Sequence, residues 1–200
     1  MNPGVLRAQQ LARTLLLSQK PIRLPIRVER LSFDKSVVID SLEHYCVITN
    51  STMHQLCAGN MAALKDGCTL VRQREDRKIY VILYNARAGS VRRQNFTLAH
   101  EVGHIYLNHE DDGPECEQQA NAFAAELLLP RVLAGTFLGR RPPGADPVDS
   151  LAQTFAVSLS MARLSWLSLD QKTDYTSQEE RLLALYEAAL PHPSEPELVY

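Results

Sequence analysis

Apolar residues recur with a helical period in several segments of this 200-residue chain. Residues 5–18 keep this period and stop before Pro21, so they predict an amphipathic helix near the N-terminus. Residues 91–108 contain no proline and only Gly103 as a helix breaker, and Ser90 precedes them as a candidate N-cap. Their apolar residues lie on most sides, which predicts a helix that is largely buried.

Extended segments are predicted in the first half of the chain. Residues 22–40 are rich in β-branched residues and are interrupted by Pro25, which predicts strands or short helical pieces. Residues 68–71 and 79–84 flank a charged stretch at 74–78, a pattern that predicts a β-hairpin. An extended substrate can add to the exposed edge of such a sheet, although the pattern does not identify the edge strand.

The C-terminal part is predicted to be helical. Asp146 and Ser158 are candidate N-caps for two short helices with helix-turn-helix-like spacing. Residues 176–190 predict a further amphipathic helix, with Ser177 and Glu180 as a capping box.

Composition predicts a folded domain in a reducing compartment. The chain is 45% apolar and 22% charged, and its net charge of −2 predicts no general attraction to nucleic acid. We expect a cytoplasmic protein without a membrane span, because no apolar run is long enough for a secretion signal. The cysteines at positions 46, 57, 68 and 116 form no C-x-x-C pair, so reduced thiols are expected.

One short motif carries the candidate chemistry. His100 and His104 lie one helical turn apart on the same face, and Glu101 stands beside the first of them. This H-E-x-x-H spacing is typical of zinc hydrolases. The alternative is a core helix that carries two histidines by chance, but an apolar helix with these groups would bury unpaired polar atoms unless something coordinates them.

A catalytic zinc site usually takes a third protein ligand and leaves one position for water. The metzincin pattern would require glycine at Leu107 and histidine at Glu110, so it fails. His109 follows His100 by nine residues, which on a continuous helix points it to the opposite side, and we expect it at the surface.

A second helix offers the third ligand. After an acidic break at 110–114, residues 116–129 predict a helix that ends before Pro130. Glu117 is the first residue of a stripe on the inward-facing side of this helix, and the stripe consists mostly of small residues. Small side chains would let the helix pack closely against Gly103. We therefore predict Glu117 as the third ligand.

The stripe continues one turn later with Asn121, whose carbonyl could accept the outer N–H of a ligating imidazole. Glu117 could instead stabilise the helix N-terminus, in which case Glu110, Asp112 or Glu115 would bind the metal.

Two blocks extend the motif into a family resemblance. Residues 93–104 read RQNFTLAHEVGH and residues 117–130 read EQQANAFAAELLLP. In this order the blocks resemble ImmA/IrrE metallopeptidases, over roughly residues 20–170. The resemblance implies Zn2+ held by His100, His104 and Glu117, with Glu101 as the catalytic base.

The expected fold is α+β and zincin-like, of the gluzincin type. A small mixed or antiparallel sheet would pack on the H-E-x-x-H helix and on a second ligand-bearing helix, followed by a helical C-terminal region. The expected division is a metallopeptidase domain at 1–138, a linker at 139–145, the helical region at 146–190 and a flexible tail at 191–200.

Two functions are compatible with these residues. The first is a zinc-dependent endopeptidase that, as the resemblance implies, cleaves a specific regulatory protein such as a helix-turn-helix repressor or an antitoxin. The second is a non-proteolytic zinc module that recruits a protein or DNA. Glu101 ligates nothing in the predicted geometry, which favours the enzyme. Residues 159–169 offer only Arg163 as a basic side chain, which argues against DNA.

Overall fold

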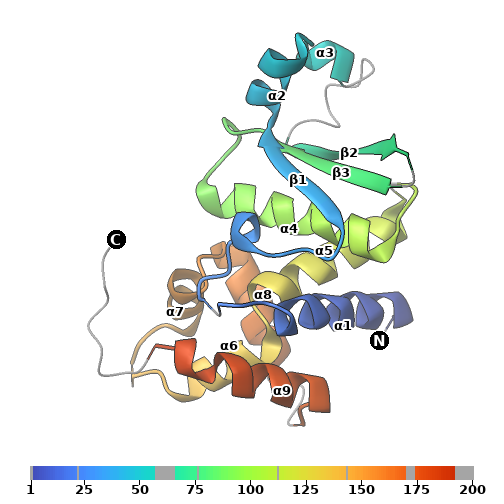
Figure 1. Cartoon of the computed structure of the whole chain (residues 1–200). Helices are drawn as coiled ribbons and strands as arrows, with labels where there is room; N and C mark the ends of the chain where they lie inside the picture. Colours follow the sequence, from blue (N-terminus) through green and yellow to red (C-terminus); the bar gives the residue numbers. More distant parts are fainter. Residues whose placement is uncertain are drawn as a thin grey trace.

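A three-stranded sheet lies along helix α4, and most of the other helices gather on the far side of α4 (Figure 1). The computed structural model describes residues 2–21, 23–56, 66–75, 77–111, 113–142, 144–169 and 174–191. Ile22, Asp112 and most of the predicted tail, residues 192–200, lie outside these ranges. The expected α+β class is confirmed.

The sheet is mixed, with the strand order β1-β3-β2. Strand β1 (Ser36–Ser41) runs parallel to β3 (Arg77–Tyr84), and β2 (Gly67–Arg74) runs antiparallel to β3. The predicted hairpin is therefore confirmed, but its charged stretch belongs largely to the strands. Strand β2 has one hydrogen-bonded neighbour among the described strands and forms an edge of the sheet.

The two faces of β3 meet different partners. Ile82 is fully buried in the main core, whereas the next residue, Leu83, is fully buried in a smaller cluster with Leu42 of helix α2 (Leu42–Thr49). This alternation follows from the two-residue period of a strand. It explains why a short apolar strand can hold the sheet between α4 and α2.

Helices α4 (Val91–Leu107) and α5 (Pro114–Leu128) form the centre of the molecule. The hydroxyl of Ser90 accepts the backbone N–H of Arg93, as predicted for an N-cap. The helices approach closely at Gly103, where an added Cβ would lie 3.2 Å from the backbone of Ala120. Small residues on both sides therefore set the distance between the two helices, as expected.

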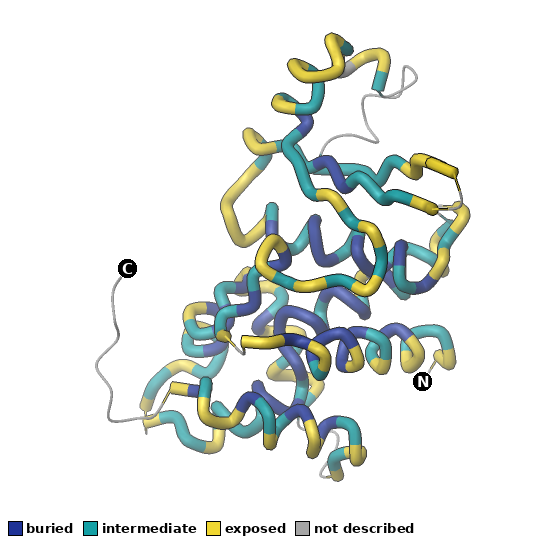
Figure 2. The backbone as a smooth tube through the Cα atoms, viewed as in Figure 1, coloured by how far each residue is buried: buried dark blue, intermediate teal, exposed yellow. Residues whose placement is uncertain are grey.

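Most of the remaining helices gather around α5 and complete the core, whereas α3 (Met53–Leu56) lies beside α2 beyond the sheet (Figure 1). The bounds of the others are α1 (Pro3–Leu17), α6 (Arg131–Gly139), α7 (Pro147–Thr154), α8 (Leu159–Leu169) and α9 (Ser177–Tyr186), with short 3-10 turns at Val28–Arg30 and Glu187–Ala189. Helix α1 packs on α5 and on α9, and buried positions run through the middle of this stack (Figure 2). In the described part of the chain, no single helix meets the length and hydropathy needed to cross a membrane; α5 and α6 meet them only as a bent pair.

The predicted capping box of the last helix is wrong by one residue. The N-cap is Thr176, whose hydroxyl accepts from the backbone of Glu179 while the Glu179 carboxylate accepts from the backbone of Thr176. Glu179 is buried and Glu180 is exposed. The tertiary structure selects this register because Glu179 points inward to two arginines.

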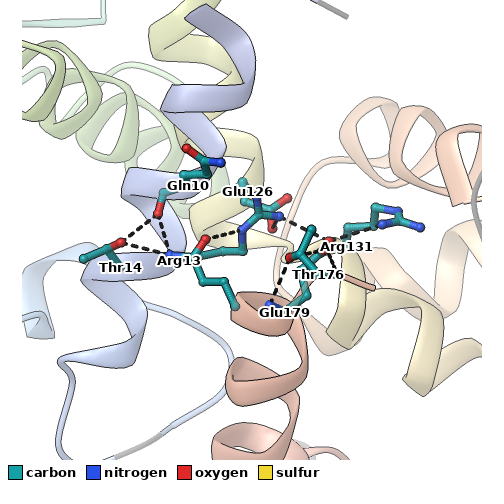
Figure 3. A network of polar contacts seen from close by, with 8 residues as sticks. Gln10, Arg13, Thr14, Glu126, Arg131, Thr176 and Glu179 are labelled. Carbon is teal, nitrogen blue, oxygen red and sulfur yellow. Dashed lines mark hydrogen bonds and ion pairs between the residues drawn. The ribbon is translucent and has the colours of Figure 1, made fainter. Parts of the chain in front are cut away.

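These arginines belong to a buried ionic cluster between α1, α5, α6 and α9 (Figure 3). Arg13 of α1 lies 3.2 Å from Glu126 of α5 and 3.2 Å from Glu179 of α9, and Arg131 of α6 also lies 3.2 Å from Glu179. The cluster therefore ties four helices together.

Candidate metal centre

Helices α4 and α5 bring the predicted ligands together. Nε2 of His100 and Nε2 of His104 lie 3.0 Å apart, and the Glu117 carboxylate oxygens lie 3.4 Å and 3.3 Å from them. Within the described ranges, this is the one group of three or more potential ligand side chains with atoms close enough to hold an ion. Glu110 and Glu115 are not part of it, and Asp112 is not among the described residues.

The three side chains fit a tetrahedral ion. Two ligand atoms placed about 2.0–2.1 Å from zinc at a tetrahedral angle are about 3.3–3.4 Å apart. The two distances to Glu117, one to each of its carboxylate oxygens, are of this size, and the two imidazole Nε2 atoms lie a few tenths of an ångström closer together than this. The Glu117 side chain is 44% exposed, so the group is open to solvent on one side.

Asn121 lies where an outer partner of His100 is needed. Its Oδ1 is 3.0 Å from Nδ1 of His100. An amide oxygen can only accept, so Nδ1 of His100 carries the hydrogen, and in the neutral ring the lone pair of Nε2, on the side of Glu117 and His104, is available to a metal ion. The predicted outer contact is therefore present in the structure.

Glu101 lines the same cleft as the three ligands, and its carboxylate contacts a residue of the sheet. The hydroxyl of Thr69, on edge strand β2, donates a 2.6 Å hydrogen bond to Oε2 of Glu101. The contact orients the carboxylate along the wall that β2 and α4 share. Sequence reasoning missed Thr69, because a single threonine in a strand carries no signal for a partner on a distant helix.

The predicted surface position of His109 is wrong. Asn108 ends α4 in the left-handed conformation, at φ 55°, so His109 leaves the helical path and turns back toward the site. It is half-buried, with Nδ1 3.1 Å from Nδ1 of His104. Lys35 fixes this turn by donating to the Ile105 carbonyl and to the Asn108 side chain. An asparagine that tolerates positive φ was the available sequence signal.

Tyr106 faces away from the centre. Its hydroxyl donates to Asp34, and burial together with this hydrogen bond raises the pKa of the Tyr106 hydroxyl well above its ordinary value. It therefore remains outside the site, as its position on the helix predicts.

The metal centre lies in a cleft of about 1450 Å³. The cleft runs from strand β2 across α4 and the start of α5 to the junction of α7 and α8. Its walls include Thr69 and Val71 of β2, Phe96 and Glu101 of α4, and Met161 of α8. Apolar and polar side chains both line the cleft around the ligand group.

Comparison with known proteins agrees with this geometry. The model of the family described as "IrrE N-terminal-like domain" (peptidase family M78) matches residues 63–166, more than half of the chain. The chain belongs to this family. The match includes the strands β2 and β3, the ligand-bearing helices α4 and α5, and most of α8.

Two curated relatives are radiation response metalloproteases called IrrE. The protein from Deinococcus deserti is 34% identical over 135 residues, which cover 57% of this chain and 44% of the relative. The protein from Deinococcus radiodurans is 36% identical over 96 residues, which cover 41% of this chain and 29% of the relative. The matched segments thus span less than half of either relative. This chain has a metalloprotease-family domain with a His/His/Glu candidate metal site.

Proposed function

We propose that this protein is a zinc-dependent endopeptidase that cleaves a specific cytoplasmic regulatory protein. The observation that carries the proposal is the separation of roles within the cleft. Ligand atoms of His100, His104 and Glu117 lie close together, while Glu101 lines the same cleft outside that group and its carboxylate accepts a hydrogen bond from Thr69. A purely structural zinc site uses four protein ligands and needs no adjacent carboxylate.

The residues fit zinc by their chemistry. Two imidazoles and one carboxylate are the set found in many zinc peptidases. Zinc at this position would supply Lewis acidity, which lowers the pKa of water and polarises a carbonyl group. Glu101 would then take a proton from the attacking water and return it to the leaving nitrogen. Asn121 keeps His100 in the tautomer that offers Nε2 to the metal.

The substrate is proposed to bind as an extended segment along β2. This strand forms a sheet edge beside the cleft, and its Thr69 and Val71 line the cleft wall. A peptide that pairs with the edge would gain main-chain hydrogen bonds and would pass Glu101. A helix-turn-helix repressor or an antitoxin is the proposed substrate class, on the basis of the family resemblance.

Direct DNA binding is not part of the proposal. Helix α8 exposes Leu159, Leu164, Trp166 and Leu167, and Arg163 is its only basic residue. Recognition of phosphates and base edges needs more basic and polar side chains than this. The start of α8 lines the cleft instead, which supports a role in holding the protein substrate.

The test uses purified, zinc-loaded protein and a candidate repressor encoded next to its gene. Wild type should cut the repressor at a defined bond, identified by mass spectrometry of the fragments. Glu101→Gln should reduce the rate about 100- to 10,000-fold, because general acid–base catalysis contributes about that factor. Glu180→Gln, an exposed carboxylate of α9, is the matched control and should cleave like wild type.

Two outcomes would overturn the proposal. Equal cleavage by wild type and Glu101→Gln would exclude Glu101 as the base. Stoichiometric zinc binding with repressor binding but no cleavage would favour the non-proteolytic recruiting module.

A further inference from the structure

A chain of hydrogen bonds leads from one proposed ligand away from the metal centre. Nδ1 of His104 faces Nδ1 of His109 at 3.1 Å, and Nε2 of His109 faces Oε1 of Gln119 at 3.2 Å. Nε2 of Gln119 then donates to Oε1 of Glu115 at 3.3 Å. The chain connects α4, the turn after it and the first turns of α5.

The direction of every hydrogen bond follows from its outer end. The Glu115 carboxylate accepts, so the amide NH2 of Gln119 faces it and the amide oxygen faces His109. His109 must therefore carry its hydrogen on Nε2, which leaves Nδ1 as an acceptor. Nδ1 of His104 must then donate, and Nε2 of His104 keeps its lone pair.

This tautomer is the one that a metal ligand needs. Nε2 of His104 is the atom that lies 3.0 Å from Nε2 of His100 and 3.3 Å from Glu117. We propose that His109 and Gln119 are positioning residues that fix the orientation and tautomer of His104 for metal binding. Asn121 performs the same task for His100 through a single contact.

The surrounding structure leaves room for this arrangement. The left-handed Asn108, held by Lys35, turns His109 inward. At the other end, helix α1 has Gly4 above Gln119, where a Cβ would overlap the Gln119 amide. The backbone therefore accommodates the side chains of both His109 and Gln119 without displacing them.

The proposal rests on the metal site of the proposed function but not on peptide cleavage, so the two can fail separately. The first measurement is zinc affinity of the full chain, by competition with a chromogenic chelator. His109→Leu should bind zinc about 10- to 100-fold more weakly, the usual effect of removing an outer partner of a ligand. Asn121→Leu should lose a similar factor and serves as the positive control.

A conservative variant separates positioning from packing. The Oδ1 atom of asparagine is attached to Cγ as Nδ1 is in histidine, so His109→Asn can still accept from His104. We expect its zinc affinity to stay within about threefold of wild type. His109→Leu, by contrast, is expected to lose about 10- to 100-fold. His44→Leu, an exposed histidine of α2 paired with Asp40, is the matched control and should bind zinc like wild type.

A second readout does not depend on peptide cleavage. Long-range 15N–1H NMR of the imidazoles in zinc-loaded protein should show His109 with its hydrogen on Nε2 and a hydrogen-bonded Nδ1–H on His104. His109→Leu should lose the downfield shift of this His104 proton, and His109→Asn should retain it. Unchanged zinc affinity in His109→Leu, equal losses in His109→Leu and His109→Asn, or a hydrogen on Nδ1 of His109 would each overturn the proposal.

Discussion

Helix α5 carries two glutamates in opposite surroundings. Glu117, near its start, has a side chain that is 44% exposed, and its ion-pair partners in the described structure are the imidazoles of His100 and His104. Glu126, near its end, is 5% exposed and pairs with the guanidinium of Arg13 (Figure 3). An arginine is always charged, so the protein itself neutralises Glu126. An imidazole carries a positive charge only when it is protonated, so Glu117 and its neighbours can instead share a cation from outside.

Within the buried cluster, the two carboxyls titrate differently. Burial raises the pKa of Glu126 to about 7, although the charge of Arg13 opposes this shift. Burial also acts on Glu179, but the hydrogen bonds from Thr176 and the charges of Arg13 and Arg131 outweigh it and lower the pKa of that carboxyl. Two carboxylates share these arginines, and the one with fewer hydrogen bonds is the harder one to ionise.

Removing Arg13 is expected to have the largest effect on the contrast. Arg13→Met leaves Glu126 and Glu179 without their shared partner and should lower the free energy of unfolding by about 3–5 kcal/mol at pH 8. The loss should shrink at pH 6, where Glu126 can take up a proton. Urea unfolding at both pH values measures this, with the exposed Arg181→Met as control. A loss under about 1 kcal/mol at pH 8 would contradict an important role for the cluster.

Removing Glu117 should affect metal binding and leave the fold intact. Glu117→Ala is expected to weaken zinc binding by at least about 100-fold, because a ligand is lost and not merely its outer partner. The free energy of unfolding without metal should change by less than about 0.5 kcal/mol, as for other exposed positions. Glu110→Ala is the comparison. Loss of zinc in Glu110→Ala with full binding in Glu117→Ala would assign the third ligand to Glu110.

The close approach of the two helices can be tested at Gly103. Gly103→Ala adds a Cβ only 3.2 Å from the Ala120 backbone and from Cβ of Phe123. We expect a destabilisation of about 1–3 kcal/mol from overpacking, together with weaker zinc binding as α4 and α5 separate. Gly139→Ala, where no atom lies within 4 Å of the new Cβ, should not destabilise the protein. Thermal unfolding and chelator competition distinguish the two variants.

The smallest effect concerns the pH dependence of stability. Because the pKa of Glu126 is raised to about 7 in the folded state, its contribution to stability is highest below the unfolded value near 4.5 and is lost as pH rises through 7. Glu126→Gln should remove about 1–2 kcal/mol of the decline between pH 5.5 and 8, since one pKa unit corresponds to about 1.4 kcal/mol. Glu179→Gln is the comparison, because its lowered pKa places its transition below this range. Identical slopes for wild type and Glu126→Gln would show that Glu126 is ionised throughout.

Local sequence determined the helices and most of the ligand geometry. The period of apolar residues, the Ser90 cap and the i, i+4 spacing of His100 and His104 act within a few residues of one another, so they can be read from the chain alone. The stripe with Glu117 and Asn121 was predictable for the same reason: both lie on one face of one helix. The helices α2, α3 and α6 were not predicted, and the cap of α9 was misplaced.

Only the tertiary structure decided which distant groups meet. Thr69 reaches Glu101 because the sheet edge lies beside α4, and His109 reaches His104 because a left-handed Asn108 ends the helix early. Arg13 joins Glu126 and Glu179 because α1, α5 and α9 pack together. Periodicity and capping fix the direction of a side chain on its own element. The contacts between elements depend on packing of the whole core, which no local pattern encodes.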